Sequence, residues 1–231
     1  MTVSLAILQS NYIPWKGYFD LIASVDKFIV YDEVQYTKQD WRNRNRIKTP
    51  RGVEWLSVPV TVNNLYNQKI FETNLAKKKW GQSHWSKLQA SYSISPFFEE
   101  ISDWLKPLFL DQEYRTISEL NITLIKAIAR YLLINTEIID SRVISGGHGK
   151  NERLVEMCKA VSATEYVSGP AAQSYLDVGM FNENGISVKW FDYSNYKEYT
   201  QHHGEFRHDV TILDLLFELG KEAPKYMKLS I

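Results

Sequence analysis

The start of the chain constrains the fold most, because it passes from the pattern of a strand to that of a helix and back. The apolar run at 3–8 predicts a buried strand, Tyr18 to Ala23 has apolar residues at helical spacing, and Lys27 to Tyr31 predicts a second strand. Strand, turn, helix and strand within about 30 residues is the size of a βαβ unit, whose strands run parallel. We therefore expect an α/β fold.

The same alternation returns near the end of the chain. Further strands are predicted at 137–144, 164–167 and 186–191, with helices from a cap at Asn151, from about 171 to 184, and from about 211 to 219. Two more strands, at 43–48 and 53–60, are joined by a turn at Pro50 and Gly52.

The middle of the chain has the pattern of helices. The clearest spans about 117–133, and Thr116 with Glu119 resembles a capping box at its start. We expect residues 1–231 to form a single α/β domain with a Rossmann-like, mostly parallel sheet, and residues 75–133 to be a mainly helical insertion.

Composition restricts the class of protein. The chain has 231 residues, 44% of them hydrophobic and 23% charged, which suits an ordinary packed core. Its one cysteine, Cys158, excludes an intrachain disulfide, and its helical spacing with Leu154 predicts a core position. No signal peptide is expected at "MTVSLAILQSNY", and no stretch approaches the roughly 20 apolar residues of a membrane span, so we expect a cytoplasmic protein.

Charge is balanced overall but uneven along the chain. With 27 basic and 27 acidic residues the formal net charge is zero, which argues against general nucleic-acid binding. Residues 38–51, however, include six basic residues and only one acidic residue. If Trp41–Lys48 is extended, Arg42, Arg44 and Arg46 share one face. We interpret this face as a site for a phosphate or carboxylate, the alternative being acidic residues elsewhere in the chain.

Ligands of open α/β sheets bind beyond the carboxyl ends of the strands. That rule brings together four segments at one predicted crevice: Gln9–Gly17, Asp32–Tyr36, Gly146–Gly149 and Ser168–Pro170. In the first, "PWKGYFD", Gly17 would let the backbone approach a ligand and Lys16 would supply a positive charge. The alternative is that Trp15 only packs the turn against the core and that Lys16 is solvated.

Two further groups are candidates for acid–base chemistry. Asp32 follows the second strand and suits a general base, a ribose ligand or a magnesium ligand, unless it is merely solvated. In "QHHGEFRHD", the histidines and acidic residues match no standard metal-ligand spacing, so we predict no metal site and assign an acid–base role to His203.

Several blocks together resemble the WbqC-like family. They are "ILQSNYIPWKGYFDLI", "DKFIVYDEVQYTKQDWRNRNRIKTP", "WLSVPV", "YVSGPAAQSYLD", "VKWFDY" and "ILDLLFELG", spread from about residue 5 to 223. That family is associated with bacterial O-antigen and other surface-polysaccharide gene clusters. The resemblance implies a role in making or modifying activated sugars.

A weaker resemblance, to nucleotidyltransferase-like adenylating ligases, concerns the fold. There an H-x-G-H motif follows the first strand, and here Trp15-Lys16-Gly17-Tyr18 occupies that place, with Gln35-Tyr36 as a later pair. Both histidines, which stabilise the phosphate charge in such enzymes, are replaced here by Trp15 and Tyr18, so the analogy concerns the fold and the chemistry can differ.

From the resemblance we expect a transferase or ligase that joins an acyl or aminoacyl group to the amine of a nucleotide-linked amino sugar. The donor is either an acyl thioester or an adenylate made from ATP. A glycosyltransferase and a non-catalytic sugar-nucleotide-binding protein stay open as alternatives, as does oligomerisation. The predicted catalytic residues are Lys16, Asp32 and His203, and the predicted binding residues are Gln9, Asn11, Tyr12, Trp15, Gly17, Tyr18, Gln35, Tyr36, Arg42, Asn43, Arg44, Asn45, Ser168, Gly169 and Tyr175.

Overall fold

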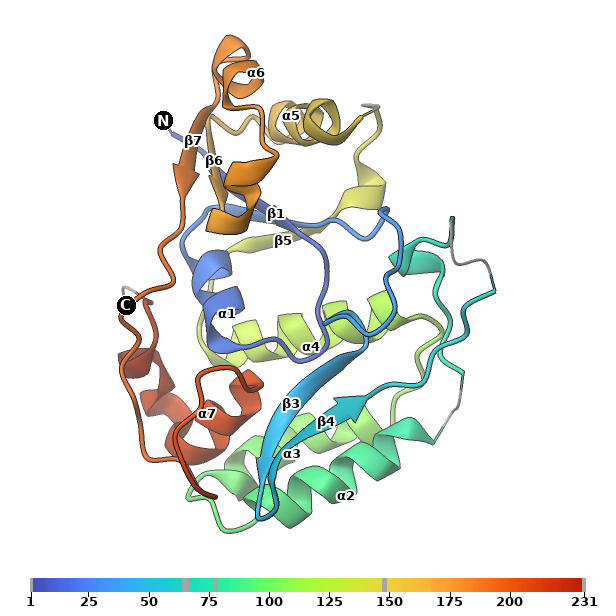
Figure 1. The fold of residues 1–231 in the computed structure, drawn as a ribbon, viewed down its shortest axis with the longest axis vertical. Helices are drawn as coiled ribbons and strands as arrows, with labels where there is room; N and C mark the ends of the chain where they lie inside the picture. Colours follow the sequence, from blue (N-terminus) through green and yellow to red (C-terminus); the bar gives the residue numbers. More distant parts are fainter. Residues whose placement is uncertain (1, 64–66, 77–78, 147–148, 230–231) are drawn as a thin grey trace.

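A computed structural model describes residues 2–63, 67–76, 79–146 and 149–229. Its main sheet has five parallel strands in the order β5-β2-β1-β6-β7 (Figure 1). Counted along the chain, these strands lie in the order 3-2-1-4-5, as in the first five strands of the Rossmann fold. The predicted α/β class is confirmed. The strands are β1 (Ser4–Leu8), β2 (Lys27–Val30), β5 (Glu137–Asp140), β6 (Glu165–Ser168) and β7 (Ser187–Trp190).

Helices cover both faces of this sheet. In Figure 1, α1 (Lys16–Ala23) and α4 (Ile117–Tyr131) lie below it, and α5 (Lys150–Ala160) lies above it beside α6 (Val178–Glu183). The alternation of side chains along β1 explains the two cores, because Ala6 packs with α1 and α4 whereas Leu5 and Ile7 pack with α5. Cys158 is in the second core, as predicted.

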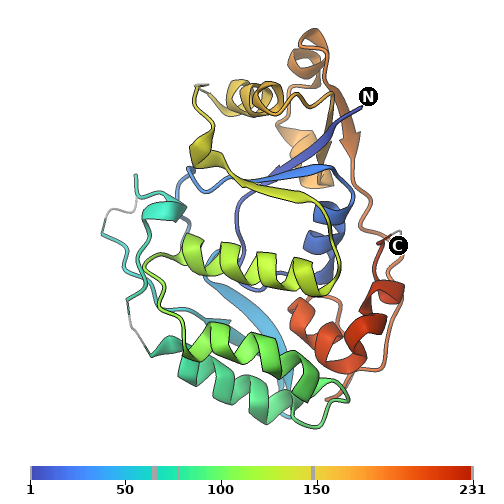
Figure 2. The same cartoon turned by 180° about the vertical axis from the view of Figure 1, so that it is seen from behind.

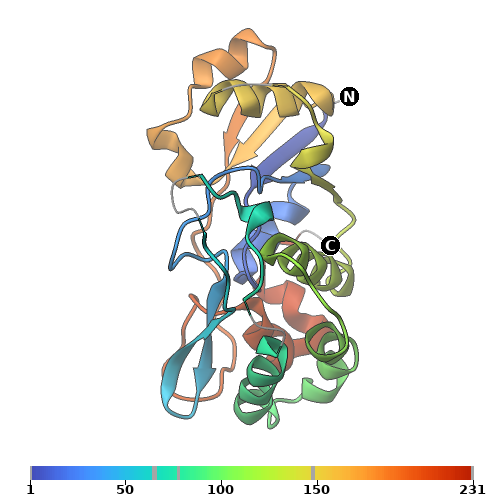
Figure 3. The same ribbon diagram turned by 90° about the vertical axis from the view of Figure 1, so that its right-hand side faces the viewer.

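A separate antiparallel hairpin lies at the other end of the molecule. It consists of β3 (Arg44–Thr49) and β4 (Gly52–Ser57), paired from Arg44 with Ser57 to Thr49 with Gly52. Figure 3 shows this hairpin on one side and the helices α2 (Trp80–Tyr92), α3 (Phe98–Leu110) and α7 (Ile212–Leu219) on the other. Within the described residues, short 3₁₀ segments span Ile70–Glu72, Ser141–Val143, Pro170–Ser174 and Gly220–Tyr226.

Helices α2, α3 and α4 account for the predicted helical character of residues 75–133, and Figure 2 shows α4 between the sheet and the other two. The capping box at the start of α4 is confirmed, because Thr116 accepts a hydrogen bond from the Glu119 backbone N–H and the Glu119 carboxylate accepts one from Thr116. That all 231 residues form one domain stays a prediction. None of the described helices is long and apolar enough to cross a membrane.

Four local predictions were wrong. The strand predicted at 53–60 ends at Ser57. The strand predicted at 137–144 ends at Asp140, whose side chain caps the 3₁₀ turn that follows. Asn151 does not cap α5, since the helix begins one residue earlier and the Asn151 amide instead bonds the backbone of Tyr175 and Asp177. The helix predicted at about 171–184 is broken into a 3₁₀ segment and α6, with a new cap at Asp177.

Candidate functional site

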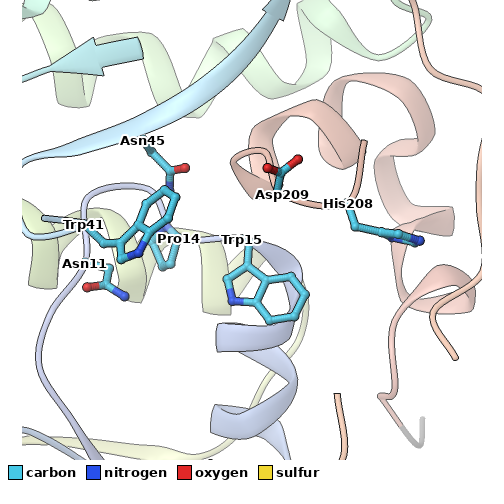
Figure 4. A pocket seen from close by; sticks show the side chains of 7 residues that line it. All are labelled: Asn11, Pro14, Trp15, Trp41, Asn45, His208 and Asp209. Atoms are coloured by element: carbon cyan, nitrogen blue, oxygen red, sulfur yellow. The ribbon is translucent and has the colours of Figure 1, made fainter. Parts of the chain in front are cut away.

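A cavity of about 280 Å³ lies where three distant segments meet (Figure 4). Asn11, Pro14 and Trp15 come from the β1–α1 turn, Trp41 and Asn45 from the start of the hairpin, and His208 and Asp209 from the segment before α7. This volume is just under the roughly 300–1,000 Å³ of ligand pockets, so the cavity is large enough for one ring of a ligand.

The β1–α1 turn enters the cavity through a strained residue. Ile13 is buried and β-branched, yet its φ is +41°, outside the region that such side chains normally occupy. The Asn45 amide holds this conformation by donating hydrogen bonds to the carbonyl oxygens of Tyr12 at 3.0 Å and Ile13 at 2.7 Å. Strain of this kind persists only where the surroundings enforce it, and here it presents Pro14 and Trp15 to the cavity.

Backbone hydrogen bonds join the three walls. The Tyr12 N–H donates to the Trp41 carbonyl at 2.9 Å, and the Ile212 N–H donates to the Pro14 carbonyl at 3.0 Å. A third bond, from the Thr211 N–H to the Arg46 carbonyl, is 2.9 Å long. The cavity is therefore formed by the fold itself rather than by flexible side chains.

Trp15 forms one side of the cavity, and Gly17 makes its position possible. A Cβ on Gly17 would come within 2.5 Å of Cη2 of the Trp15 indole. The other surroundings of the indole are Tyr193 and Tyr196, with ring centroids 5.4 and 5.6 Å away. Gly17 thus accommodates Trp15 and has no direct contact with the cavity, contrary to its predicted ligand-facing position.

Lys16 is enclosed and does not line the cavity. Its ammonium lies 4.8 Å from the ring centroid of Tyr196 and 5.2 Å from that of Tyr199, and it donates to the Lys197 carbonyl at 3.3 Å. Burial lowers the pKa of Lys16 to about 8, although the nearby carboxylates Asp20 and Asp214 oppose this. The solvated alternative for Lys16 is wrong, and its catalytic role stays a prediction.

The three arginines differ in their partners. Strand β3 begins at Arg44, so Arg42 lies outside the face that the sequence assigned to all three. Its guanidinium donates to the Ser10 carbonyl at 3.2 Å and to the Asn11 side-chain oxygen, and lies 3.6 Å from the Asp40 carboxylate. Arg42 therefore supports the turn that carries Asn11.

Arg44 and Arg46 do share one face, as predicted. Both guanidiniums lie over the Trp55 ring, 4.2 and 4.7 Å from its centroid. Arg46 also forms an ion pair with Asp209 of the cavity wall. Arg44 donates to the Gln39 carbonyl.

Asp32 is buried below the turn. Its carboxylate accepts hydrogen bonds from the Ser10 N–H at 2.8 Å, the Ser10 hydroxyl at 2.7 Å and the Ser118 hydroxyl at 2.6 Å. Burial raises the pKa of Asp32, and these hydrogen bonds oppose the shift. In this position Asp32 ties the β1–α1 turn to α4 and does not line the cavity, so its predicted catalytic role has no geometric support.

Most of the aromatic residues that were predicted to bind a ligand lie outside the cavity. Tyr12 is fully buried and its hydroxyl pairs with His84 at 2.7 Å, while the Tyr18 hydroxyl donates to the Gln9 carbonyl at 3.0 Å. Tyr36 is buried in the core, and Tyr175 is 61% exposed, beyond the cavity.

The remaining predicted residues support the surrounding backbone. The Asn43 amide donates to the Val58 carbonyl, the Ser168 carbonyl accepts from Phe191, and Gly169 lies under Tyr193. Gln35 forms an isolated bridge with Lys69. Of the four predicted crevice segments only Gln9–Gly17 lines the cavity, and residues 147–148 lie outside the described residues.

The histidines of "QHHGEFRHD" separate in space. The His203 ring bonds the Ser91 carbonyl at 2.8 Å, and His202 lies 3.5 Å from the Glu218 carboxylate, so neither lines the cavity. His208 does. Across the described residues, no three His, Cys, Asp or Glu side chains converge as a metal site would require.

Pro14, Trp41, His208 and Asp209 line the cavity but were not among the predicted binding or catalytic residues. Trp41 stands directly before the arginine cluster that drew the prediction, and His208 with Asp209 belongs to the histidine-rich stretch. Both stretches therefore stood out in the sequence as unusual. The sequence did not show which residues of each stretch lie together at the cavity.

The sequence model of the WbqC-like protein family matches residues 9–226. The chain belongs to this family. It is also similar to the uncharacterized protein Rv1507c of Mycobacterium tuberculosis, with 51% identity over 224 residues that cover 97% of each chain. No solved structure matches the chain.

The two titratable groups that line the cavity of this WbqC-like protein, Asp209 and His208, differ in how their pKa values are shifted. Asp209 is held by Arg46 and by two hydrogen bonds of 2.8 Å from Arg207, and the Arg207 guanidinium lowers the pKa of the Asp209 carboxyl. Burial lowers the pKa of His208, and the positive charge of Lys16 adds to the shift. Near neutral pH the cavity therefore presents a carboxylate and a neutral imidazole.

Proposed function

We propose that this WbqC-like protein binds a nucleotide-linked amino sugar in the cavity and joins an acyl or aminoacyl group to its amine. The biological context is the one that the resemblance implies, the assembly of a bacterial surface polysaccharide such as an O-antigen. One observation carries the proposal: Trp15 and Trp41 line a cavity of one-ring size together with Asn11, Asn45 and Asp209.

This combination suits a sugar. A pyranose has apolar C–H faces, which pack on indole rings, and a rim of hydroxyl groups, which bond to amides and carboxylates. The Asn11 oxygen is occupied by Arg42, but the Asn11 NH₂ group has no hydrogen-bond partner within the described parts of the chain. It remains available to a ligand hydroxyl. Asp209 keeps acceptor capacity for a hydroxyl or an ammonium, since a carboxylate accepts about four hydrogen bonds.

Acylation needs the amine in its neutral form and an activated acyl group. The amine nitrogen attacks the acyl carbonyl carbon, the C–N bond forms, and the bond to the thiolate of a thioester or to the phosphate of an adenylate breaks. One proton leaves the amine in this step. His208 is our candidate to accept it, because its imidazole is neutral near pH 7 and lies beside the cavity.

A second candidate is a protein that binds the sugar nucleotide without transforming it. Two observations favour it. The cavity's only carboxylate among the described residues is already paired with Arg46 and Arg207. In Figure 4 the His208 imidazole extends away from Trp41 and Asn45.

Mass spectrometry separates these candidates. The purified protein is incubated with UDP- and dTDP-linked amino sugars, together with acetyl-CoA or with ATP and glycine, and UDP-glucose serves as the control that lacks an amine. An acyl or aminoacyl mass increment on the amino sugar supports the transferase. Tight binding without product supports the second candidate, and release of nucleoside diphosphate indicates a glycosyltransferase. No binding of any sugar nucleotide overturns the proposal. The reaction belongs in the cytoplasm, where nucleotide-linked sugars are made.

A further inference from the structure

One border of the cavity continues into an exposed aromatic surface. Trp41, which lines the cavity, has its ring centroid 5.4 Å from that of Trp55, and the two indoles are 38% and 37% exposed. Arg44 and Arg46 lie over Trp55, and Arg46 is also 5.4 Å from the Trp41 ring. We call Trp41, Arg44, Arg46 and Trp55 the hairpin platform.

The surroundings of the platform are positively charged. Arg42 is paired with Asp40, while Arg46 and Arg207 share Asp209. Arg44 has no carboxylate within 4.0 Å among the residues that the structure describes. The four guanidinium groups of Arg42, Arg44, Arg46 and Arg207 are balanced by only two carboxylates, those of Asp40 and Asp209. The local excess is therefore two positive charges.

Arg44 has unused hydrogen-bonding capacity. A guanidinium has five N–H groups, and one nitrogen of Arg44 donates to the Gln39 carbonyl. Its Nε is buried and has no hydrogen-bond partner in the described chain. A ligand oxygen cannot reach a buried Nε, so an anion would bind the Nη–H groups that the Gln39 carbonyl leaves unused.

The size of the cavity shows where the rest of a ligand would lie. At about 280 Å³ the cavity has room for the sugar ring, so the nucleoside diphosphate must extend over a border. On the side of His208, Lys16 is enclosed by aromatic rings, and Arg207 is held by two hydrogen bonds to Asp209. On the side of Trp41 the border is the cationic platform.

We propose that the hairpin platform binds the nucleoside diphosphate of the sugar nucleotide, with the diphosphate oxygens on Arg44 and the base stacked on Trp55. This inference rests on the proposed function and identifies the part of the substrate that its cavity does not hold. Guanidiniums bind phosphate oxygens through paired charge-assisted hydrogen bonds, and a base stacked on an aromatic ring contributes about 1–3 kcal/mol.

The test is a titration of the full-length protein with UDP and with dTDP, read by quenching of tryptophan fluorescence and by calorimetry. Arg44→Gln keeps a polar planar group but removes the charge, and we expect it to weaken UDP binding about tenfold or more. Trp55→Leu should weaken UDP and dTDP alike. Arg51→Gln is the matched control, because Arg51 lies in the turn of the same hairpin and pairs with Glu54, away from the platform.

The outcomes separate this inference from the proposed reaction. UDP binding that depends on Arg44 supports the platform even if no acylated sugar is ever formed. Acylated product with an unchanged KM in Arg44→Gln supports the reaction and overturns the platform. Failure to bind UDP or dTDP, or equal affinity of wild type and Arg44→Gln, also overturns it. A melting temperature within a few degrees of wild type ensures that Arg44→Gln is compared as a folded protein.

Discussion

The indole of Trp15 lies so close to Gly17 that an added Cβ would come within 2.5 Å of its Cη2 atom. Only glycine leaves space for a ring at that distance. The tryptophan and the glycine of "PWKGYFD" therefore act together, the first as a wall of the cavity and the second as the space that lets this wall form.

Gly17→Ala should move Trp15 out of position. Alanine is favoured over glycine in a helix by up to about 1 kcal/mol, which offsets part of the strain, so we expect the free energy of unfolding to change little. The affinity for a UDP-linked amino sugar should fall about tenfold or more, as measured by calorimetry. Gly179→Ala in α6 is the control, since an added Cβ there meets only the Asp177 carboxylate that caps α6, and neither residue lines the cavity. Unchanged affinity in Gly17→Ala would show that Trp15 does not contribute to ligand binding.

His208 and His203 offer a matched comparison. If His208 accepts the proton of the sugar amine, His208→Gln should lower kcat by roughly 10²–10⁴-fold. His203 bonds the Ser91 carbonyl and does not line the cavity, so His203→Gln should retain near wild-type turnover. The reverse order of effects would restore His203 as the acid–base residue.

The pH dependence of the wild type tests the same assignment. Burial, the charge of Lys16 and the opposing charges of Glu198 and Asp209 act on His208, with burial the largest, and the pKa of His208 lies below its ordinary value of 6.5. A base is active when deprotonated, so kcat/KM should show a limb that rises with pH and has its midpoint below pH 6.5. The sugar ammonium gives a second rising limb of its own, so the assignment rests on comparison with His208→Gln, which should lose the first limb and keep the second. A limb below pH 6.5 that persists in His208→Gln would exclude His208 as the base.

The parts of the fold that depend on local pattern were predictable. The βαβ unit and the capping box of Thr116 and Glu119 each depend on residues close in sequence, and the structure confirms them. The candidate site depends on long-range contacts. The Asp32 carboxylate is occupied by Ser118, 86 residues away, and Arg46 by Asp209, 163 residues away.

Other predicted site residues lie outside the cavity because they are buried. Tyr12 and Lys16 have the residue types of a ligand site, but one pairs with His84 in the core and the other is enclosed by Tyr196 and Tyr199. These rings come from a segment without regular secondary structure, whose path no periodicity in the sequence could predict. A sequence pattern shows which polar residues are unusual. It does not show which residues, distant in the sequence, will pack around them in the folded chain.

Asp32→Ala tests the structural role of the buried carboxylate. Removing it leaves the Ser10 N–H and the hydroxyls of Ser10 and Ser118 without their acceptor, and each unsatisfied buried group lowers stability by roughly 1–3 kcal/mol. We expect a loss of about 3 kcal/mol or more in urea unfolding, with sugar-nucleotide affinity largely kept by the protein that remains folded. Normal stability together with lost turnover would instead show that Asp32 is catalytic.

Lys16→Met tests the enclosed ammonium through the pH dependence of stability. The pKa of Lys16 is about 8 in the folded protein and near 10.5 when the chain is unfolded. Between these values the unfolded chain binds more protons than the folded chain, so this lysine makes the free energy of unfolding rise with pH. Below pH 8 the folded protein bears the full cost of burying the charge.

Methionine keeps an apolar stem of similar length and has no proton to lose. The stability of Lys16→Met relative to wild type should therefore be greatest near pH 7 and decline by about 1–2 kcal/mol up to pH 9.5, as measured by urea unfolding. Lys159→Met, at a half-exposed position on α5, should show no such trend. Because Lys16 does not line the cavity, sugar-nucleotide affinity should stay within about twofold of wild type, a change of less than roughly 0.5 kcal/mol. A large loss of affinity at constant stability would return Lys16 to the binding site.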